Sequence, residues 1–279
     1  MALPCYQRSI YDEGIIIVLN DKPFFKLKAK RSNLLRLLNS KKMKQIKTGI
    51  LALLALVSVL TVRSQTLDEV IDKYLAAMGG KDKLLALNSI VMEGSMNFNG
   101  QSLPVKITQL NNKALRVDIT INGMANYTIQ TKDSGWNYFP IQGQKKAEAT
   151  PPAVVKEAVD ALDIQSVLLN YKDKGHTVVL VGKDDVDGTE CFKIKVTTKS
   201  GMEQTFFIDP ANYYIIKQII KTKANGQEQE QPQNLSDYKK LDNGYVFPFS
   251  MTGFGPGELK ITKIDVNPKI DESIFKPSN

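Results

Sequence analysis

Residues 89–121 read SIVMEGSMNFNGQSLPVKITQLNNKALRVDITI, and this stretch decides the fold class. Apolar side chains occupy alternate positions in three successive runs, with polar side chains between them. A period of two places each set on one face of a β-strand. Asn99-Gly100, between the first two runs, is typical of a tight hairpin turn. The stretch therefore predicts antiparallel strands with one apolar face and one polar face.

The same alternation continues beyond this stretch, and short turn sequences separate the runs. Residues 127–129 and 136–138 extend the first series, and Asp133-Ser134-Gly135 forms the turn between them. After a break the pattern resumes, and the sequence between 224 and 233 predicts a polar loop. The later strands are expected at 177–181, 190–198, 204–209, 213–222, 234–241, 245–252 and 258–266.

Helical periodicity occurs in two places. Apolar residues at helical spacing predict a helix over 66–78, where Thr66 and Glu69 form a capping box. A shorter helical segment follows over 81–87. Thr150-Pro151-Pro152 opens a second helical region, which we expect to contain one or two helices and to end near Gly175.

A meander of this length must curl or split, because a long sheet has to bury its apolar face and protect its edges. A two-sheet sandwich and a curled half-barrel are both possible. The predicted helices have apolar stripes and no partner except the sheet, which favours the half-barrel. We therefore expect a mainly β (α+β) fold, a large curved antiparallel sheet with a helical lid, enclosing an apolar cavity.

The segment 43–64 has the layout of a secretory signal peptide. Lys44 and Lys47 precede a nearly unbroken apolar run over 49–62, and cleavage is expected before Gln65. A membrane anchor is the alternative, but the run is shorter than the ~20 residues that a spanning helix needs. Residues 1–42 show no targeting pattern, so we interpret them as a spurious extension. The predicted mature protein is one periplasmic domain, 65–279.

The charge of the chain argues against a nucleic-acid partner. Residues 1–64 carry 12 of the 37 basic side chains and 3 of the 29 acidic ones. The remaining chain has 25 basic and 26 acidic side chains, so its net charge is close to zero. A polyanion-binding surface needs a basic excess, which the predicted mature domain lacks.

No residue pattern indicates a metal, a cofactor or a catalytic triad. His176 is the one histidine, and we expect it to be a solvated loop residue. Cys191 lies in a strand pattern, which favours a small buried thiol. The segment 183–188 places Lys183 where a calcium loop needs Asp, so we interpret it as a hairpin turn. We expect no cofactor and no enzyme activity.

The apolar alternate positions of the early strands are the candidate ligand-binding residues. Ordinary core packing is the alternative for each of them, and methionine suits contact with flexible chains. The candidates are Met92, Met96, Phe98, Val105, Ile107, Val117, Ile129, Trp136 and Tyr138.

Four segments resemble the LolA-like family of outer-membrane lipoprotein-sorting proteins. They are the opening helix with Ala77-Met78-Gly79-Gly80, the turn and aromatic strand over 132–140, the Phe206-to-Pro210 segment, and the C-terminal stretch 264–277. The resemblance implies a curved sheet around an acyl-chain cavity. Proteins of the family have an arginine before the third strand, and this sequence has Asn111 or Asn112 at that position. The role of that charged residue therefore cannot be transferred to this chain.

The first functional prediction is a monomeric periplasmic carrier of lipid or lipoprotein acyl chains, with membrane-associated donor and acceptor proteins as further partners. A lipid-responsive sensor that regulates a protein partner is the second. A purely structural or interaction domain with a filled interior is the third. An enzyme is the fourth and least favoured.

Overall fold

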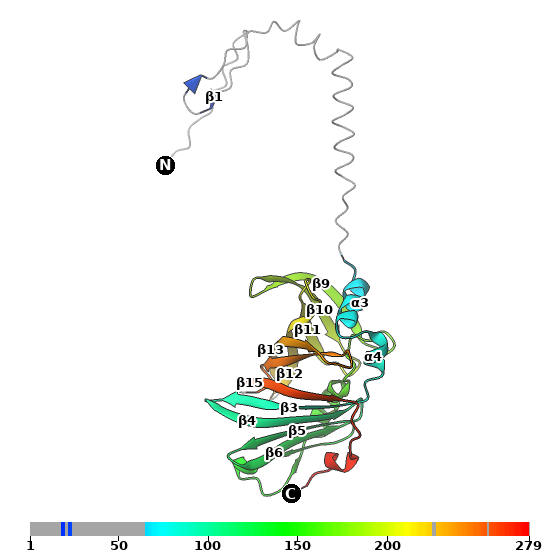
Figure 1. Ribbon diagram of the computed structural model, residues 1–279, viewed down its shortest axis with the longest axis vertical. Helices are drawn as coiled ribbons and strands as arrows, with labels where there is room; N and C mark the ends of the chain where they lie inside the picture. Colours follow the sequence, from blue (N-terminus) through cyan, green and yellow to red (C-terminus); the bar gives the residue numbers. More distant parts are fainter. Residues whose placement is uncertain (1–17, 20–21, 24–64, 225–226, 256, 279) are drawn as a thin grey trace. The chain divides into compact units, whose positions relative to one another are not determined.

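The computed structural model describes residues 18–19, 22–23, 65–224, 227–255 and 257–278 (Figure 1). The chain divides into two compact units, Met1–Ser64 and Gln65–Asn279. In the first unit, strands β1 (Val18–Leu19) and β2 (Lys22–Pro23) pair antiparallel. The predicted signal peptide and nearly all of the predicted extension lie outside the described residues.

The second unit is built on one antiparallel sheet of 13 strands. In space the order is β8-β7-β6-β5-β4-β3-β15-β14-β13-β12-β11-β10-β9. The strands are β3 Ser89–Phe98, β4 Gln101–Leu110, β5 Ala114–Ile121, β6 Met124–Thr131, β7 Gly135–Tyr138, β8 Glu148–Ala149, β9 Thr177–Val186, β10 Thr189–Thr197, β11 Glu203–Ile208, β12 Ile215–Ala224, β13 Gln227–Lys240, β14 Val246–Thr252 and β15 Glu258–Val266.

One pairing joins the two halves of this sheet. Every other neighbouring pair is consecutive in the chain, but β3 pairs with β15, far along the chain, where Glu258 lies opposite Asn97. The outer strands β8 and β9 do not pair with each other, so the sheet stays open. The predicted mainly β fold with a large antiparallel sheet is confirmed, and it is not a closed barrel.

The helices are few and short. Helix α3 (Leu67–Ala77) begins at the predicted capping box, and α4 (Lys81–Leu85) follows it. Figure 1 shows both helices beside the sheet. Val70, Ile71 and Leu75 of α3 pack with residues of β9, β10 and β11 in the largest core cluster. The remaining helical elements are η1 Pro140–Gln142, α5 Pro152–Glu157, η2 Val159–Leu162 and η3 Glu272–Phe275.

The helices predicted between 150 and 175 are shorter than expected. Residues 163–175 form turns, and Ser166 and Asn170 have positive φ angles, which ends helical geometry. Val167, Leu168 and Leu169 are buried consecutively rather than along one helical stripe. Residues 163–175 pack between α3 and the sheet, and this packing, rather than helical propensity, determines their conformation.

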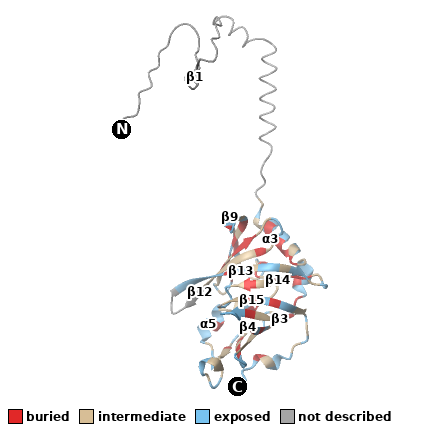
Figure 2. Ribbon diagram, turned by 60° about the vertical axis from the view of Figure 1, so that its left-hand side comes forward, coloured by how far each residue is buried: buried red, intermediate tan, exposed pale blue. Residues whose placement is uncertain are grey.

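The polar loop predicted at 224–233 is wrong. These residues, apart from 225 and 226, belong to the long hairpin of β12 and β13, whose exposed residues 228–231 are seen in Figure 2. In the register, Lys221 faces Glu230 and Gln218 faces Gln233. Opposite charges and paired amides stabilise cross-strand neighbours without apolar side chains. The absence of apolar alternation hid this strand in the sequence.

Candidate functional site

The two faces of the sheet differ in what covers them. Paired residues of antiparallel strands share a face, so the register extends each face across the sheet. Met96 pairs with Leu259, Leu259 with Met251, and Met251 with Leu235, which packs against the cluster of α3. We call this helix-bearing face the inner face and the opposite one the outer face.

Part of the inner face is an apolar cluster that contains no helix residue. We call this cluster the inner patch. Its buried members are Met96, Val105, Phe249, Met251, Leu259 and Ile261, and its partly buried members are Met92, Ile107, Val117, Ile119, Leu241, Phe247 and Ile264. The buried members keep only 3–8% of their surface exposed, whereas the partly buried ones remain accessible. The patch therefore combines a packed base with accessible apolar side chains.

The structure divides the nine candidate residues. Met92, Met96, Val105, Ile107 and Val117 all lie in the inner patch. Phe98 lies beyond it, at the β3–β4 turn, and is 36% exposed.

Ile129, Trp136 and Tyr138 lie on the outer face, so the expectation that one face carries all nine is wrong. Val117 pairs with Thr128, while Ile129 pairs with Arg116. The three belong to a cluster with Phe275 of the C-terminal segment (residues 267–278). Alternation alone cannot relate the faces of two strands, because a one-residue change in register reverses every side chain.

Arg116 holds the C-terminal segment on the outer face. Its guanidinium makes two-pronged contact with Asp118, with Nη2 2.7 Å from Oδ1, and its Nη1 donates to the carbonyl oxygen of Ile274 at 2.7 Å. The same group lies 4.3 Å from the centre of the Tyr127 ring. Tyr127 also hydrogen bonds with the backbone of Ser278.

Replacing Arg116 by alanine is expected to lower the free energy of unfolding by about 1–3 kcal/mol, because Asp118 and the Ile274 carbonyl lose their partner. The urea midpoint and the protease sensitivity of the C-terminal segment measure this. Lys113→Ala is the control: its pair with Glu272 is well exposed, and its loss should cost less than about 1 kcal/mol. Equal effects of the two substitutions would contradict the proposed role of Arg116.

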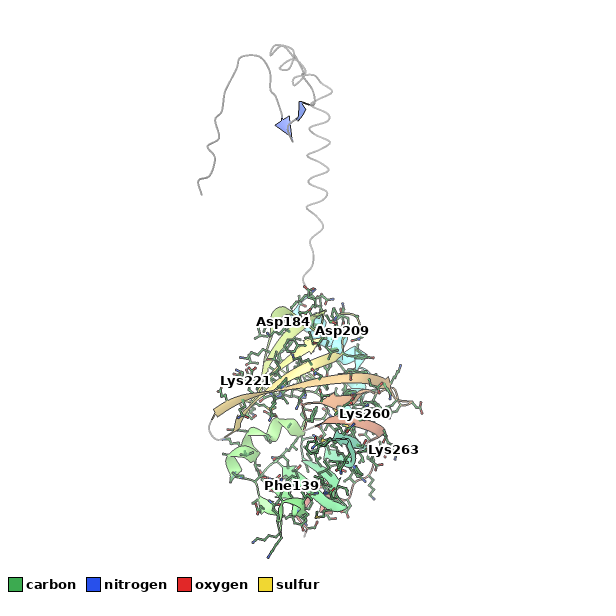
Figure 3. All side chains as sticks on the ribbon, turned by 90° about the vertical axis from the view of Figure 1, so that its left-hand side faces the viewer. Phe139, Asp184, Asp209, Lys221, Lys260 and Lys263 are labelled. Atoms are coloured by element: carbon green, nitrogen blue, oxygen red, sulfur yellow. The ribbon has the colours of Figure 1, made fainter. Side chains whose placement is uncertain are left out.

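Outside the C-terminal cluster, the outer face carries ion pairs along the strands. Examples are Lys193 with Asp184, Lys195 and Lys221 with Glu203, Lys260 with Glu258, and Lys263 with Asp265. Figure 3 labels Asp184, Lys221, Lys260 and Lys263 of this set. These exposed pairs add little stability individually. The outer face is therefore polar only in part, because Val186, Cys191 and Phe207 form a buried apolar cluster beside these pairs.

Amide side chains hold the mid-chain segment, residues 140–175, against β4–β7. The bonds are Ile141 N to Asn126 Oδ1, Asn137 Nδ2 to Thr150 Oγ1, Gln130 Nε2 to the Val155 oxygen, Gln109 Nε2 to the Ala161 oxygen, and Ile164 N to Asn111 Oδ1. Gln165 donates to the oxygens of Leu85 and Leu87 beside α4. The mid-chain segment thus links β4–β7 to α4 and the residues that follow it.

The same segment reaches the β10–β11 turn through Asp160. Its carboxylate accepts from the backbone N–H of Ser200 at 3.1 Å and from the Ser200 hydroxyl. Nearby His176 is partly buried, and its Nδ1 accepts from the backbone N–H of Lys199 at 3.0 Å. The predicted solvated loop histidine is thus partly wrong. No sequence pattern indicated this cluster. Because the Ser200 hydroxyl and backbone N–H both donate to Asp160, these hydrogen bonds hold the mid-chain segment to the β10–β11 turn.

Asp160→Asn is expected to lower the free energy of unfolding at pH 7 by about 1–2 kcal/mol. Burial raises the pKa of the Asp160 carboxyl, but hydrogen bonds from Ser200 and Thr198 outweigh it and hold this pKa below its ordinary value of 3.8. Because this pKa is lower in the folded protein than in the unfolded chain, the ionised Asp160 stabilises the fold above pH 3.8. That contribution to the free energy of unfolding disappears as the pH falls through the pKa of the folded state. The urea midpoints of wild type and Asp160→Asn should therefore differ at pH 7 and converge in strong acid.

Asp173→Asn serves as the control for this substitution, since Asp173 is exposed. Burial also lowers the pKa of His176, so the unfolded chain takes up a proton there more readily, and acid destabilises the fold from about pH 6.5 downward in both proteins. A difference between wild type and Asp160→Asn that persists unchanged at pH 2 would contradict the charge-based account.

Two grooves in the described part of the chain stand out, and neither is lined by the inner patch. The larger, about 540 Å³, lies between α3 and the β13–β14 turn and includes Lys83, Lys240 and Asp242. The second, about 330 Å³, includes Lys132, Val155 and Val159. Both are open and mixed in polarity, so the inner patch is the better match for an apolar ligand.

Reactive and metal-binding groups are scarce in the described part of the chain. Cys191 is buried as predicted, and burial raises the pKa of its thiol to about 11, which keeps it protonated. No three His, Cys, Asp or Glu side chains of the described residues are grouped as metal ligands would be. Among the same residues, no helix has the length and apolar character needed to cross a membrane.

Comparison with known proteins finds solved structures that are similar to this chain. No family model matches the chain, and no curated protein matches its sequence. A domain assigned to outer membrane lipoprotein sorting from Vibrio parahaemolyticus matches with 16% identity and a TM-score of 0.43, covering 74% of this chain and 94% of that one. A LolA superfamily protein from Nitrosomonas europaea matches with 10% identity and a TM-score of 0.47, covering 76% and 98%.

A protein of the DUF1329 family from Desulfovibrio piger also matches, with 14% identity and a TM-score of 0.48, covering 76% of this chain and 98% of that one. Two of these three structures belong by their descriptions to lipoprotein sorting or to the LolA superfamily, the family that four segments of the sequence resemble. At these identities the likeness concerns the fold. Ligand and role have to be argued from the geometry of this chain.

Proposed function

We propose that residues 65–279 bind the acyl chain of a lipid or lipoprotein on the inner patch and carry it within the cell envelope, without catalysing a reaction. The observation that supports this is the inner patch itself, which presents accessible apolar side chains from neighbouring strands and contains no helix residue. Soluble domains rarely leave such surface without a partner. The predicted export signal agrees with an envelope location.

The chemistry of the patch suits a flexible apolar chain. Met92 and Met96 are unbranched and adapt their shape, while Val105, Ile107 and Val117 provide a stiff apolar floor. Each buried methylene of a ligand contributes roughly 0.8 kcal/mol, so an acyl chain needs no charged anchor to bind.

Native mass spectrometry of the protein purified from a Gram-negative periplasm tests this proposal. We expect a co-purified lipid, which a fluorescent fatty acid displaces. A protein that carries no lipid and does not bind the fatty acid would refute the carrier function. Lipid that remains bound while a regulatory protein co-purifies would favour the alternative, a lipid-responsive sensor.

A further inference from the structure

Three turns lie together at one end of the sheet. They are the β3–β4 turn at Asn99-Gly100, the β5–β6 turn at Asn122-Gly123, and the loop between β14 and β15 that begins at Gly253. Because β3, β4, β5 and β6 pair antiparallel in order, the first two turns share an end. Glu258 pairs with Asn97, which places the third loop beside the first turn. We call this end the hairpin rim.

Each turn of the hairpin rim exposes one large apolar side chain. Phe98 is 36%, Met124 39% and Phe254 47% exposed. Only four other large hydrophobic side chains in the described residues are comparably exposed. The two tight turns need Asn and Gly for their positive φ angles, but they do not need an aromatic residue or methionine next to them. The formation of these turns therefore does not explain the exposed side chains of Phe98 and Met124.

The hairpin rim is continuous with the inner patch. A Cβ atom on Gly255 would lie 3.0 Å from Cε of Met96, so the β14–β15 loop passes close to a member of the patch. Phe98 follows Met96 by two residues on β3 and therefore projects to the same face. Apolar surface thus extends from the exposed turns to the patch without a polar interruption along β3.

Two lysines flank the hairpin rim. Lys145 and Lys146 are exposed in the β7–β8 connection, after Phe139, which Figure 3 labels. Tyr138 at the end of β7 pairs with Tyr127, so the connection leaves from the rim end of the sheet. In the described part of the chain, neither lysine has a carboxylate partner within ion-pair distance. Unpaired lysines beside apolar side chains complement an anionic lipid surface.

We propose that the hairpin rim docks on the surface of a lipid bilayer, with Phe98, Met124 and Phe254 inserted between the lipids and Lys145 and Lys146 at the headgroups. A bilayer fits better than a folded protein, because the three side chains lie on separate turns and line neither of the two grooves. The inference rests on the proposed carrier function, since docking would open a path for an acyl chain from the bilayer to the inner patch.

Sedimentation with vesicles tests the proposal, using residues 65–279, whose four core clusters all lie within that unit. The vesicles contain phosphatidylcholine, with or without phosphatidylglycerol. The triple variant Phe98→Ser, Met124→Ser, Phe254→Ser should partition on the order of tenfold to a hundredfold less to both vesicle types. Lys145→Gln with Lys146→Gln should weaken binding roughly tenfold, and only where phosphatidylglycerol is present.

The matched control replaces three comparably exposed apolar residues elsewhere, Leu85→Ser, Val179→Ser and Val181→Ser. Retained vesicle binding by this control supports the hairpin rim as the docking surface. The proposal is overturned if wild type does not bind vesicles, if the rim variant binds as wild type does, or if the control loses as much. Fatty-acid binding is measured separately, without vesicles. If the protein binds no fatty acid but still docks on vesicles through the hairpin rim, the carrier function is refuted and the docking proposal stands.

Discussion

Replacing Gly94 by alanine is expected to destabilise the second unit by about 3–5 kcal/mol, a large part of the stability of an ordinary domain. A Cβ atom at this position would lie 2.1 Å from the carbonyl oxygen of Lys260 and 2.9 Å from Cα of Ile261. Both atoms belong to the backbone of β15 and cannot move aside without separating it from β3. That pairing is the one that joins the two halves of the sheet.

Urea unfolding followed by circular dichroism measures the effect of Gly94→Ala. Gly100→Ala is the control, because nothing lies within 4 Å of the methyl group that it would add, and only its φ of 79° opposes a side chain. That strain costs about 1 kcal/mol. If Gly94→Ala unfolds at the same urea concentration as Gly100→Ala, β3 and β15 are not as close as the structure places them.

The second large effect is expected on ligand binding. Ile107 and Val117 pair directly across β4 and β5 and are both accessible members of the inner patch. Changing both to asparagine should weaken binding of a fluorescent fatty acid on the order of a hundredfold, because two apolar contacts are replaced by amides that need hydrogen bonds. Fluorescence titration gives the affinity, and the urea midpoint checks that the variant is folded.

The matched control for this double variant places the same amide on the other face. Val91 pairs with Thr108 on the outer face, and Val179 is exposed at the edge strand β9. Val91→Asn with Val179→Asn should leave fatty-acid affinity within about twofold of wild type. The conservative pair Ile107→Leu and Val117→Ile should also retain binding. If both asparagine variants lose affinity alike, the ligand does not occupy the inner patch.

The local elements were well predicted from local signals. The capping box of Thr66 and Glu69, the Asn99-Gly100 hairpin and the alternation of β3 to β5 are properties of neighbouring residues, and the structure has all of them. Strand β13 was missed in its first half because Gln227 to Gln233 has no apolar period. Its pairing depends on the opposite charges and amides of β12, which no local pattern contains.

The candidate site was also predicted only in part, because local patterns do not contain the pairing of strands. Five of the nine candidates lie in the inner patch, but alternation within each strand also placed Ile129, Trp136 and Tyr138 with them. The missing information was the register of β5 and β6, in which Arg116 faces Ile129. The members contributed by β14 and β15 were missed, since they join the patch only through the pairing of β3 with β15.

By itself the sequence determined that this protein is built from amphipathic antiparallel strands with short helices, because alternation, capping and turn chemistry act over a few residues. The tertiary structure decided which apolar faces are shared, that the C-terminal segment covers part of the outer face, and that three distant turns form one rim. These depend on register and on the close approach at Gly94, where backbone atoms from opposite ends of the second unit leave no room for a side chain.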